Sequence, residues 1–411
     1  MTNEREAKYY CGIDVGTNCV RCVIGRAADK PGELPHILGV GQAKTFGMRR
    51  GNVVDPVSVA QSIDSALAEA EKVAGVSVDG ATFSINGQNV MTHNSKGASS
   101  IENNDHVSNS DVRQALDAAS IVQLPANQRM LELIPVGFSV DGEDQTQDPV
   151  GMSGNRLEVE AVIISGAEAH LRTLEKAIST ANINCNGLQS EVRAGAEAVL
   201  TREQRERGVI YIDIGAQTTS LAVFEETELR RIIVVPMGSA HITNDLAIGL
   251  QVEVDFAEKI KTENAAVGHG VDMGEIFSVE WDDEIHHFKA RDVDMIVRAR
   301  LEEIFEKLAK ALKKMGQHSR LPSGIVLGGG GSAIEGIEEV AKDILKLPCK
   351  KAEISTYETS TGDILGFEWS AAVGLMLFDD REFNSLNNAG NGVLDQIFDR
   401  TKKILFKGKK R

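Results

Sequence analysis

The 411-residue chain is poor in cysteine, in basic charge and in long apolar runs, and each shortage argues against a class of protein. Its five cysteines are odd in number and scattered, which favours reduced thiols over a disulfide framework. Lysine and arginine number 44 against 60 acidic residues, a net charge of −16, which argues against general nucleic-acid binding. No run approaches the roughly 20 apolar residues of a membrane span, and no signal peptide is evident. We therefore expect a cytoplasmic protein.

Two short motifs that resemble metal sites are better explained as packed side chains. Cys19 and Cys22 spell C-x-x-C, but residues three apart in a strand lie on opposite faces. No second cysteine or histidine pair lies near them in the sequence. His286 and His287 also lack a matching set of carboxylates or cysteines. The sequence predicts no metal site at either place.

Alternating strand and helix patterns predict an α/β protein with two halves. Apolar residues make up 42% of the chain, enough for the two or three cores that this length favours. The predicted strands are 9–15, 19–25, 37–43, 185–190, 208–214, 218–224 and 324–329. The predicted helices are 57–74, 168–182, 192–203, 239–263, 295–315, 333–346 and 368–378. Residues 80–164 have several short strands around one helix, which indicates a small α+β module inserted into the first half.

One acidic turn occurs twice, as DVGTNCVRC at 14–22 and DIGAQTTSL at 213–221. In each copy an aspartate closes an apolar strand, and a glycine follows two residues later. Aspartate at the carboxyl end of a strand can hold Mg²⁺ directly or through water. The glycine lets backbone N–H groups approach phosphate oxygens. Two such turns facing each other would hold a triphosphate from both sides, with the metal between Asp14 and Asp213.

A third stretch strengthens this interpretation. The sequence GIVLGGGGSAIEGIEEVA at 324–341 predicts a buried strand, a glycine-rich turn and a helix. Such a turn brings the backbone close to a flat base or a sugar. Each of the three motifs is weak evidence alone, but together they favour a nucleotide site.

With these motifs in view, the chain resembles the actin, sugar-kinase and Hsp70 superfamily, and more narrowly the bacterial cell-division family FtsA. The resemblance extends from about residue 9 to residue 406 and depends on six features. These are GIDVGTN, DPVGMSGNRLEVEAVII, IDIGAQTTSL, GSAHITNDLAIGL with the following AEKIK, GIVLGGGGSAIEGI and the basic tail. The family implies a two-lobed actin-like ATPase fold with an inserted α+β subdomain and a C-terminal amphipathic helix.

The resemblance also implies subdomain bounds and a site for ATP and Mg²⁺. The implied subdomains are 1–79 with 165–190, the insertion 80–164, 191–238 with 306–378, and 239–305. The implied nucleotide contacts are Asp14, Gly16, Thr17, Asn18, Gly215, Gln217, Thr218, Thr219, Glu258, Lys261, Gly328, Gly329, Gly330 and Ser332. Asp14 and Asp213 would hold the metal, and Glu191 with Asp213 would be catalytic.

Two of these assignments have a plainer alternative. Glu258 and Lys261 lie three apart on one helical face and could be an exposed ion pair. Glu191, where relatives place a residue that organises Mg²⁺ or the attacking water, could be a surface glutamate. Ala216 and Gln217 stand where many relatives have glycines, so they could crowd the phosphates. Binding is therefore better supported than turnover, and we expect a slow regulatory ATPase at most.

The last residues reverse the charge of the chain. We expect residues 379–392 to be a flexible linker and residues 393–411 to be a basic amphipathic helix. At about 1.5 Å per residue, a helix of roughly 15 residues is too short to span a bilayer, so it would lie in the interface. The same pattern could dock on this protein's own body or on a partner. The predicted membrane contacts are Val393, Leu394, Ile397, Phe398, Lys402, Lys403, Ile404, Leu405 and Lys407.

The resemblance implies an actin-like cell-division protein that polymerises on the cytoplasmic face of the membrane at the division site. It would bind copies of itself, anionic lipid, the C-terminal segment of the tubulin-like protein FtsZ and later division proteins. Two alternatives remain open at this point. One is a small-molecule phosphotransferase of the same superfamily, which would need an acidic base and a substrate pocket. The other is an actin-like pilus-assembly protein, which would not need the basic tail.

Overall fold

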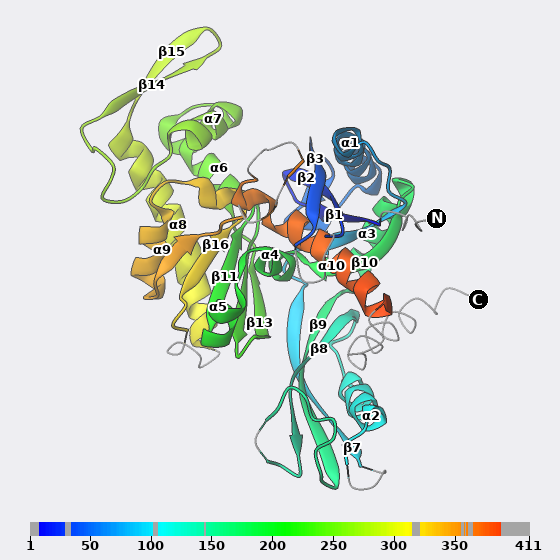
Figure 1. The fold of residues 1–411 in the computed structure, drawn as a ribbon. Helices are drawn as coiled ribbons and strands as arrows, with labels where there is room; N and C mark the ends of the chain where they lie inside the picture. Colours follow the sequence, from blue (N-terminus) through cyan, green and yellow to red (C-terminus); the bar gives the residue numbers. More distant parts are fainter. Residues whose placement is uncertain are drawn as a thin grey trace.

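The computed structural model describes residues 8–387 except for 29–33, 102–105, 144, 315–320, 355–356, 358 and 361–364. Within these residues, two five-stranded sheets form the centres of two lobes, and a third, smaller sheet extends from the first lobe (Figure 1). The predicted tail helix 393–411 and residues 388–392 of the predicted linker lie outside the described residues.

The first sheet has the strand order β10-β6-β1-β2-β3. Its strands are β1 (Tyr9–Val15), β2 (Cys19–Arg26), β3 (His36–Lys44), β6 (Gly80–Ile85) and β10 (Asn184–Ser190). β1 is antiparallel to β2 and parallel to β6. All of β1 after its first residue is buried, which is typical of a central strand covered on both faces. The predicted strands at 9–15, 19–25 and 37–43 are confirmed.

The second sheet repeats this topology in the order β13-β12-β11-β16-β17. Its strands are β11 (Val209–Ile214), β12 (Thr219–Glu225), β13 (Glu228–Val235), β16 (Ile325–Gly328) and β17 (Cys349–Lys351). β11 is antiparallel to β12 and parallel to β16, as β1 is to β2 and β6. Each acidic turn therefore joins the central strand of its sheet to the antiparallel neighbour, which is β2 in the first sheet and β12 in the second. The edge strands β13 and β17 were not predicted.

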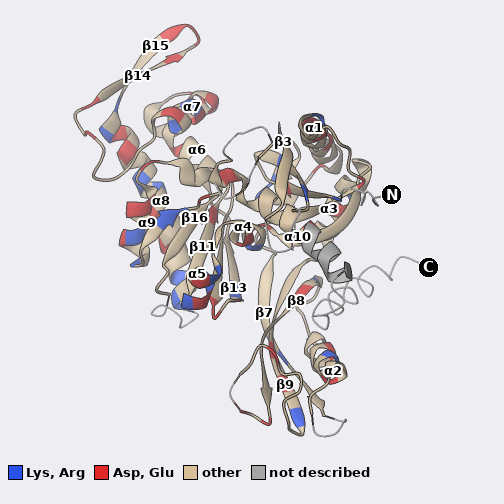
Figure 2. Ribbon diagram, viewed as in Figure 1, with Lys and Arg blue, Asp and Glu red and all other residues tan. Residues whose placement is uncertain are grey.

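The helices cover these sheets. They are α1 (Pro56–Ala74), α3 (Glu168–Thr180), α4 (Glu191–Val199), α5 (Arg202–Arg207), α6 (Ser239–Leu250), α7 (Val254–Asn264), α8 (Ala290–Lys313), α9 (Ile337–Leu345) and α10 (Ser370–Asn387). In Figure 2 charged residues gather on the outer helices α5, α8 and α9. No helix in the described part of the chain is long and apolar enough to cross a membrane.

Three predicted helices are shorter or divided. The helix predicted over 239–263 is α6 and α7, separated at Gln251, whose φ of 56° ends the first of them. The helix predicted over 192–203 ends at Val199, because a capping box at Thr201 starts α5. The helix predicted over 333–346 begins only at Ile337, after a short 3-10 turn. Local caps, which periodicity does not detect, set these ends.

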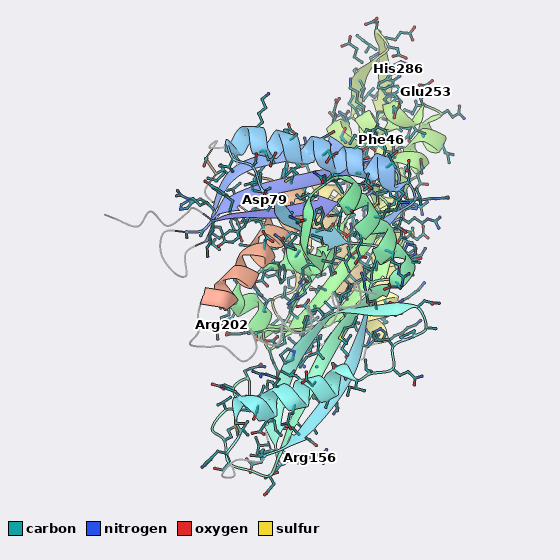
Figure 3. All side chains as sticks on the ribbon, turned by 90° about the vertical axis from the view of Figure 1, so that its right-hand side faces the viewer. Phe46, Asp79, Arg156, Arg202, Glu253 and His286 are labelled. Carbon is teal, nitrogen blue, oxygen red and sulfur yellow. The ribbon has the colours of Figure 1, made fainter. Side chains whose placement is uncertain are left out.

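The inserted subdomain consists of β7 (Met91–Ser100), α2 (Asn109–Ser120), β8 (Gln128–Val140) and β9 (Arg156–Ala167). Its sheet has the order β7-β9-β8. The predicted start at residue 80 is wrong, because residues 80–85 form β6 and pair with β1 and β10 in the first sheet. Figure 3 labels Arg156 at the far end of this subdomain.

A buried ion pair ties the inserted subdomain to the rest of the molecule. Arg193 of α4 donates a hydrogen bond to Glu132 of β8, and both side chains are largely buried. Burial raises the pKa of Glu132, and the Arg193 guanidinium opposes that rise. The same guanidinium lies 4.7 Å from the ring centroid of Phe378 in α10. Arg193 therefore connects α4, the insertion and the last described helix.

A hairpin that was not predicted projects from the opposite end of the molecule. It consists of β14 (Ile276–Trp281) and β15 (Glu284–Lys289), and Figure 3 places His286 there. The His286 ring packs 4.9 Å from that of Phe256, and His287 Nδ1 lies 2.9 Å from Ser278 Oγ. Directly after the hairpin, α8 begins and continues through the predicted subdomain boundary at 305/306.

The predicted linker begins too early. α10 continues to Asn387, so residues 379–387 are helical. Asp379 is buried and accepts hydrogen bonds from Cys11 N at 3.0 Å, Thr82 Oγ1 at 2.9 Å and Asn186 Nδ2 at 3.0 Å. These donors come from β1, β6 and β10. One carboxylate thus fixes the last helix to three strands of the first sheet.

We expect Asp379→Ala to lower the free energy of unfolding by about 3 kcal/mol, because it leaves three donors without their acceptor. Urea denaturation measures this change. Asp343→Ala, on the exposed face of α9, is the matched control and should change stability by less than about 0.5 kcal/mol. Equal effects of the two substitutions would contradict the structural role of Asp379.

Candidate functional site

The two acidic turns have the same backbone geometry. Gly16 N donates to Cys19 O over 3.2 Å, and Gly215 N donates to Thr218 O over 2.9 Å. The strand pairs on either side of the turns also have matching registers. A turn closed by the same hydrogen bond in each lobe places its aspartate at the carboxyl end of the central strand, as the repeat predicts.

Three carboxyl groups converge between the lobes. Asp14, Asp213 and Glu191 are only 5%, 4% and 9% exposed. Burial is the main cause that raises the pKa of each. The charge of Asp14 adds to the rise at Asp213, whose pKa reaches about 7, and both aspartates raise the pKa of Glu191 well above its usual value. A hydrogen bond with Asp213 also raises the pKa of Glu191, so these two carboxyl groups are adjacent, and the charge of Asp14 acts on both. Glu191 is not a surface residue.

Several partners of these carboxyl groups were not predicted. Arg21 pairs with Asp14 across β1 and β2, and its positive charge lowers the pKa of all three acids. The Tyr211 hydroxyl donates to Asp213 Oδ2 over 3.2 Å. Ser84 and Asn86 at the end of β6 form hydrogen bonds with Asp14 that lower its pKa. Cross-strand register in the first hairpin would have identified Arg21, and the parallel neighbour β6 would have identified the other two.

The carboxyl groups suit a metal ion that also has ligands from outside the protein. Asp14 Oδ1 is buried and has no hydrogen-bond partner. In the described ranges, no three His, Cys, Asp or Glu side chains form a metal site by themselves. Mg²⁺ usually keeps several waters and takes one or two carboxylates together with phosphates. An unpaired buried carboxylate oxygen fits that coordination.

A small hairpin joins the two turns. It consists of β4 (Met48–Arg49) and β5 (Asn52–Val53). At its tip, Arg50 N donates to Gln217 Oε1 over 2.8 Å, and Gly51 N donates to Thr17 Oγ1 over 3.1 Å. Thr17 belongs to the first turn and Gln217 to the second. The hairpin therefore bridges the lobes through two residues that the sequence assigned to the nucleotide.

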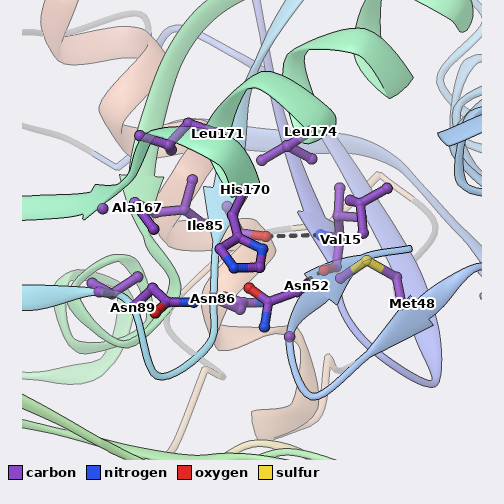
Figure 4. A pocket seen from close by; sticks show the side chains of 15 residues that line it. Val15, Met48, Asn52, Ile85, Asn86, Asn89, Ala167, His170, Leu171 and Leu174 are labelled. Carbon is purple, nitrogen blue, oxygen red and sulfur yellow. Dashed lines mark hydrogen bonds between the residues drawn. The ribbon is translucent and has the colours of Figure 1, made fainter. Parts of the chain in front are cut away.

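A cavity of about 30 Å³ lies behind the first turn, enough room for one or two waters (Figure 4). Val15, Asn86 and His170 contribute to its lining, and the β4-β5 hairpin closes one side. Asn86 Nδ2 donates to Val15 O over 3.2 Å, while its Oδ1 is buried without a partner. The cavity is too small for a nucleotide.

The glycine-rich turn approaches the second aspartate closely. Gly329 has a φ of 76°, and a Cβ on it would collide with the Asp213 carboxylate. A Cβ on Gly328 would collide with the Tyr211 hydroxyl, whereas one on Gly330 would meet open space. Only glycine permits this approach, which brings the predicted third motif to the acidic site.

Two predicted contact residues have their hydroxyls engaged elsewhere. Ser332 Oγ donates to Gly328 O over 2.6 Å, and Thr219 Oγ1 donates to Met237 O over 2.8 Å. Both residues are fully buried. These side chains hold the local backbone, so any contact they make with a nucleotide would come from their main chain.

Glu258 and Lys261 form the predicted pair, but Lys261 is not exposed. Lys261 Nζ lies 2.6 Å from Glu258 Oε2 and donates to Thr243 Oγ1 over 2.9 Å. Lys261 is only 8% exposed, whereas the Glu258 side chain is 43% exposed. Burial distinguishes this pair from an ordinary solvated ion pair of a helix surface.

Two lobes of equal topology, with an acidic turn in each and a shared carboxyl cluster, define the actin-like class of fold. Solved structures agree. A chain of a PilM-PilN type IV pilus biogenesis complex covers 90% of this chain, and the match includes 98% of that chain. Its TM-score is 0.66 and its sequence identity is 16%. The structure of MreB5 of Spiroplasma citri bound to ADP covers 93% of this chain, and the match includes 99% of the MreB5 chain. Its TM-score is 0.55 and its sequence identity is 12%. At these identities the likeness shows the fold alone.

Sequence comparison identifies the family. The model of the SHS2 domain inserted in FtsA matches residues 87–165, and that of cell division protein FtsA matches residues 210–374. Cell division protein FtsA of Pseudomonas aeruginosa is 30% identical over 92% of this chain and 91% of its own. Cell division protein FtsA of Bacillus subtilis is 32% identical over 82% of this chain and 77% of its own length. The chain belongs to the FtsA family of cell-division proteins, as its motifs predicted.

We expect Asp213→Asn to be more stable than the parent chain at high pH in buffer without metal or nucleotide. Because the pKa of Asp213 is about 7 in the folded state against 3.8 in the ordinary carboxyl, the folded protein keeps a proton that the unfolded chain loses. The stability of the parent therefore falls as the pH rises through this window, by up to about 4 kcal/mol.

Urea denaturation of both chains at about pH 5 and about pH 8 measures the difference. The advantage of Asp213→Asn should be larger at the higher pH. An advantage that is the same at both values would show that Asp213 is ionised in the folded protein throughout this range.

Proposed function

We propose that the chain binds ATP with Mg²⁺ between its lobes and acts as a membrane-attached filament protein in cell division. The observation that carries the nucleotide site is that Asp14, Asp213 and Glu191 are buried beside two glycine turns closed by the same hydrogen bond. Bound Mg²⁺ would offset the negative charges that meet there. The family membership supports the role in division.

In this proposal each lobe supplies one aspartate and one glycine turn. Asp14 and Asp213 would hold the metal, and Arg21 would limit their mutual repulsion. Glu191 is the first residue of α4, and burial together with the charges of Asp213 and Asp14 raises its pKa well above the usual value. In the proposed site its carboxyl group would orient a water at the end of the phosphate chain.

The remaining motifs form the rest of the nucleotide site. The glycine-rich turn at 328–331 lies against Asp213 and leaves open space at Gly330 for the base or sugar. Lys261, held by Glu258 and Thr243, is the buried cation that we place beside the adenosine. Gln217 is bound to the β4-β5 hairpin instead of being free to orient water, which supports slow turnover.

The membrane role is proposed for the last residues. α10 is fixed to the first sheet at Asp379, and the basic amphipathic residues 393–411 follow it in sequence. One short amphipathic helix binds a membrane weakly, whereas a filament that carries many of them gains avidity. Self-assembly on the cytoplasmic face would then hold FtsZ through its C-terminal segment and recruit later division proteins.

The other two candidate functions are not favoured. Relatives at 30% and 32% identity are cell-division proteins, whereas the pilus protein PilM shares only the fold. A phosphotransferase would need a second acidic base beside a substrate pocket. The cavity beside the first turn has room only for water.

Asp213→Ala should weaken ATP binding in the presence of Mg²⁺ by at least about tenfold, because it removes one of the two carboxylates proposed for the metal. Titration calorimetry measures the affinity, and Asp343→Ala on the exposed face of α9 is the matched control. An affinity equal to that of the control would remove Asp213 from the metal site.

The full chain should float with vesicles that contain anionic lipid, and a chain ending at Asn391 should not. Flotation of the full chain should increase with ATP, because assembly multiplies the lipid contacts. Vesicles of neutral lipid give the charge control, since each basic residue contributes about 1 kcal/mol only near an anionic surface. If both chains float equally, the last residues do not supply the membrane contact.

A further inference from the structure

The tip of the β4-β5 hairpin lies across both acidic turns, although no motif assigned it a role. Its two successive backbone amides are bound by side chains from different lobes, Gln217 and Thr17. We propose that Arg50, at this tip, binds the terminal phosphate of the nucleotide and lets the hairpin distinguish a triphosphate from a diphosphate. This inference rests on the ATP site proposed above.

The position of Arg50 is fixed from three sides. Its own N–H is held by Gln217 at 2.8 Å, and its carbonyl accepts a hydrogen bond from Asn52 Nδ2 at 3.2 Å. The next residue, Gly51, lies so close to Gly87 that a Cβ would collide with the Gly87 backbone. Arg50 itself has a φ of 50°, in the left-handed region that non-glycine residues rarely adopt. The hairpin therefore presents this arginine at a defined place beside the second turn.

The charge balance of the site needs such a residue. The turns themselves carry no basic side chain near the phosphates, since Thr17 and Asn18 occupy the first and Ala216 and Gln217 the second. Arg21 is the cation that acts on the three buried carboxyl groups. The Arg50 side chain is exposed and forms no ion pair with the residues that the structure describes. Its five N–H donors match phosphate oxygens, and such charge-assisted hydrogen bonds are strong.

The terminal phosphate is the part of the ligand that this arginine suits. A triphosphate held by both turns ends between them, where the hairpin connects Thr17 with Gln217. A diphosphate is shorter and leaves this end empty. An arginine on the hairpin would therefore contribute to ATP affinity and much less to ADP affinity. Contact with ATP would also hold the hairpin, a first-lobe element, more firmly against the second lobe.

The test compares Arg50→Ala, Arg50→Lys and the matched neighbour Arg49→Ala in the full chain. Arg49 is also exposed and lies in the same hairpin, where it pairs with Asn52 in the strand register. Titration calorimetry with ATP and with ADP, each with Mg²⁺, gives the affinities, and thermal melting checks that each variant is folded. Arg50→Ala should weaken ATP binding about tenfold and ADP binding less than about twofold.

Arg50→Lys should recover part of the ATP affinity, because lysine keeps the charge but not the planar fork. Arg49→Ala should leave both affinities within about twofold of the parent. Equal losses for ATP and ADP, no loss in Arg50→Ala, or the same loss in Arg49→Ala would each overturn the inference. A parent chain that binds neither nucleotide would instead overturn the proposed function, so the two failures are distinguishable.

Discussion

The arrangement of the molecule depends on the repulsion among three acids buried at the meeting point of its lobes. Carboxylates in a low-dielectric space destabilise one another, and each loses hydration as well. Asp14, Asp213 and Glu191 nevertheless lie together, with Arg21 as the opposing charge. Burial raises the pKa of all three carboxyl groups, and the charges of the neighbouring aspartates add to the rise at Asp213 and Glu191. A cation bound at this place would offset the repulsion among the three carboxylates.

The two sheets explain how one chain builds such a site. The same strand order and directions occur in both lobes, and the same glycine hydrogen bond closes both turns. Each central strand has a parallel neighbour from a distant part of the chain. Side chains from separate segments therefore lie together at the carboxyl edge of each sheet. Ser84 and Asn86 reach Asp14 in this way, and the glycine-rich turn reaches Asp213. The duplication places related edges face to face, whereas the insertion and the β14-β15 hairpin extend away from them.

Much of this could be predicted from the sequence, and the remainder has definite physical causes. Apolar runs with an aspartate at the end identified β1 and β11, because central strands are buried on both faces. The β14-β15 hairpin was missed, because its mostly exposed strands lack a continuous apolar run. The edge strand β13 was missed although its last four residues are apolar. Residues 80–85 were assigned to the insertion because a strand pattern does not reveal its partner. The contact of Gln217 with the β4-β5 hairpin depends on tertiary structure and has no local signal.

The short helix α4 has a mechanical consequence. Glu191 begins it at the acidic cluster, and two residues later Arg193 is clamped between Glu132 of the insertion and the ring of Phe378. The same helix packs so tightly against α10 that Gly374 tolerates no side chain beside Ala194. Because α4 contacts both the inserted subdomain and α10, it has little freedom to tilt independently of them. The acidic cluster is therefore joined through α4, a helix of nine residues, to the inserted subdomain and to α10.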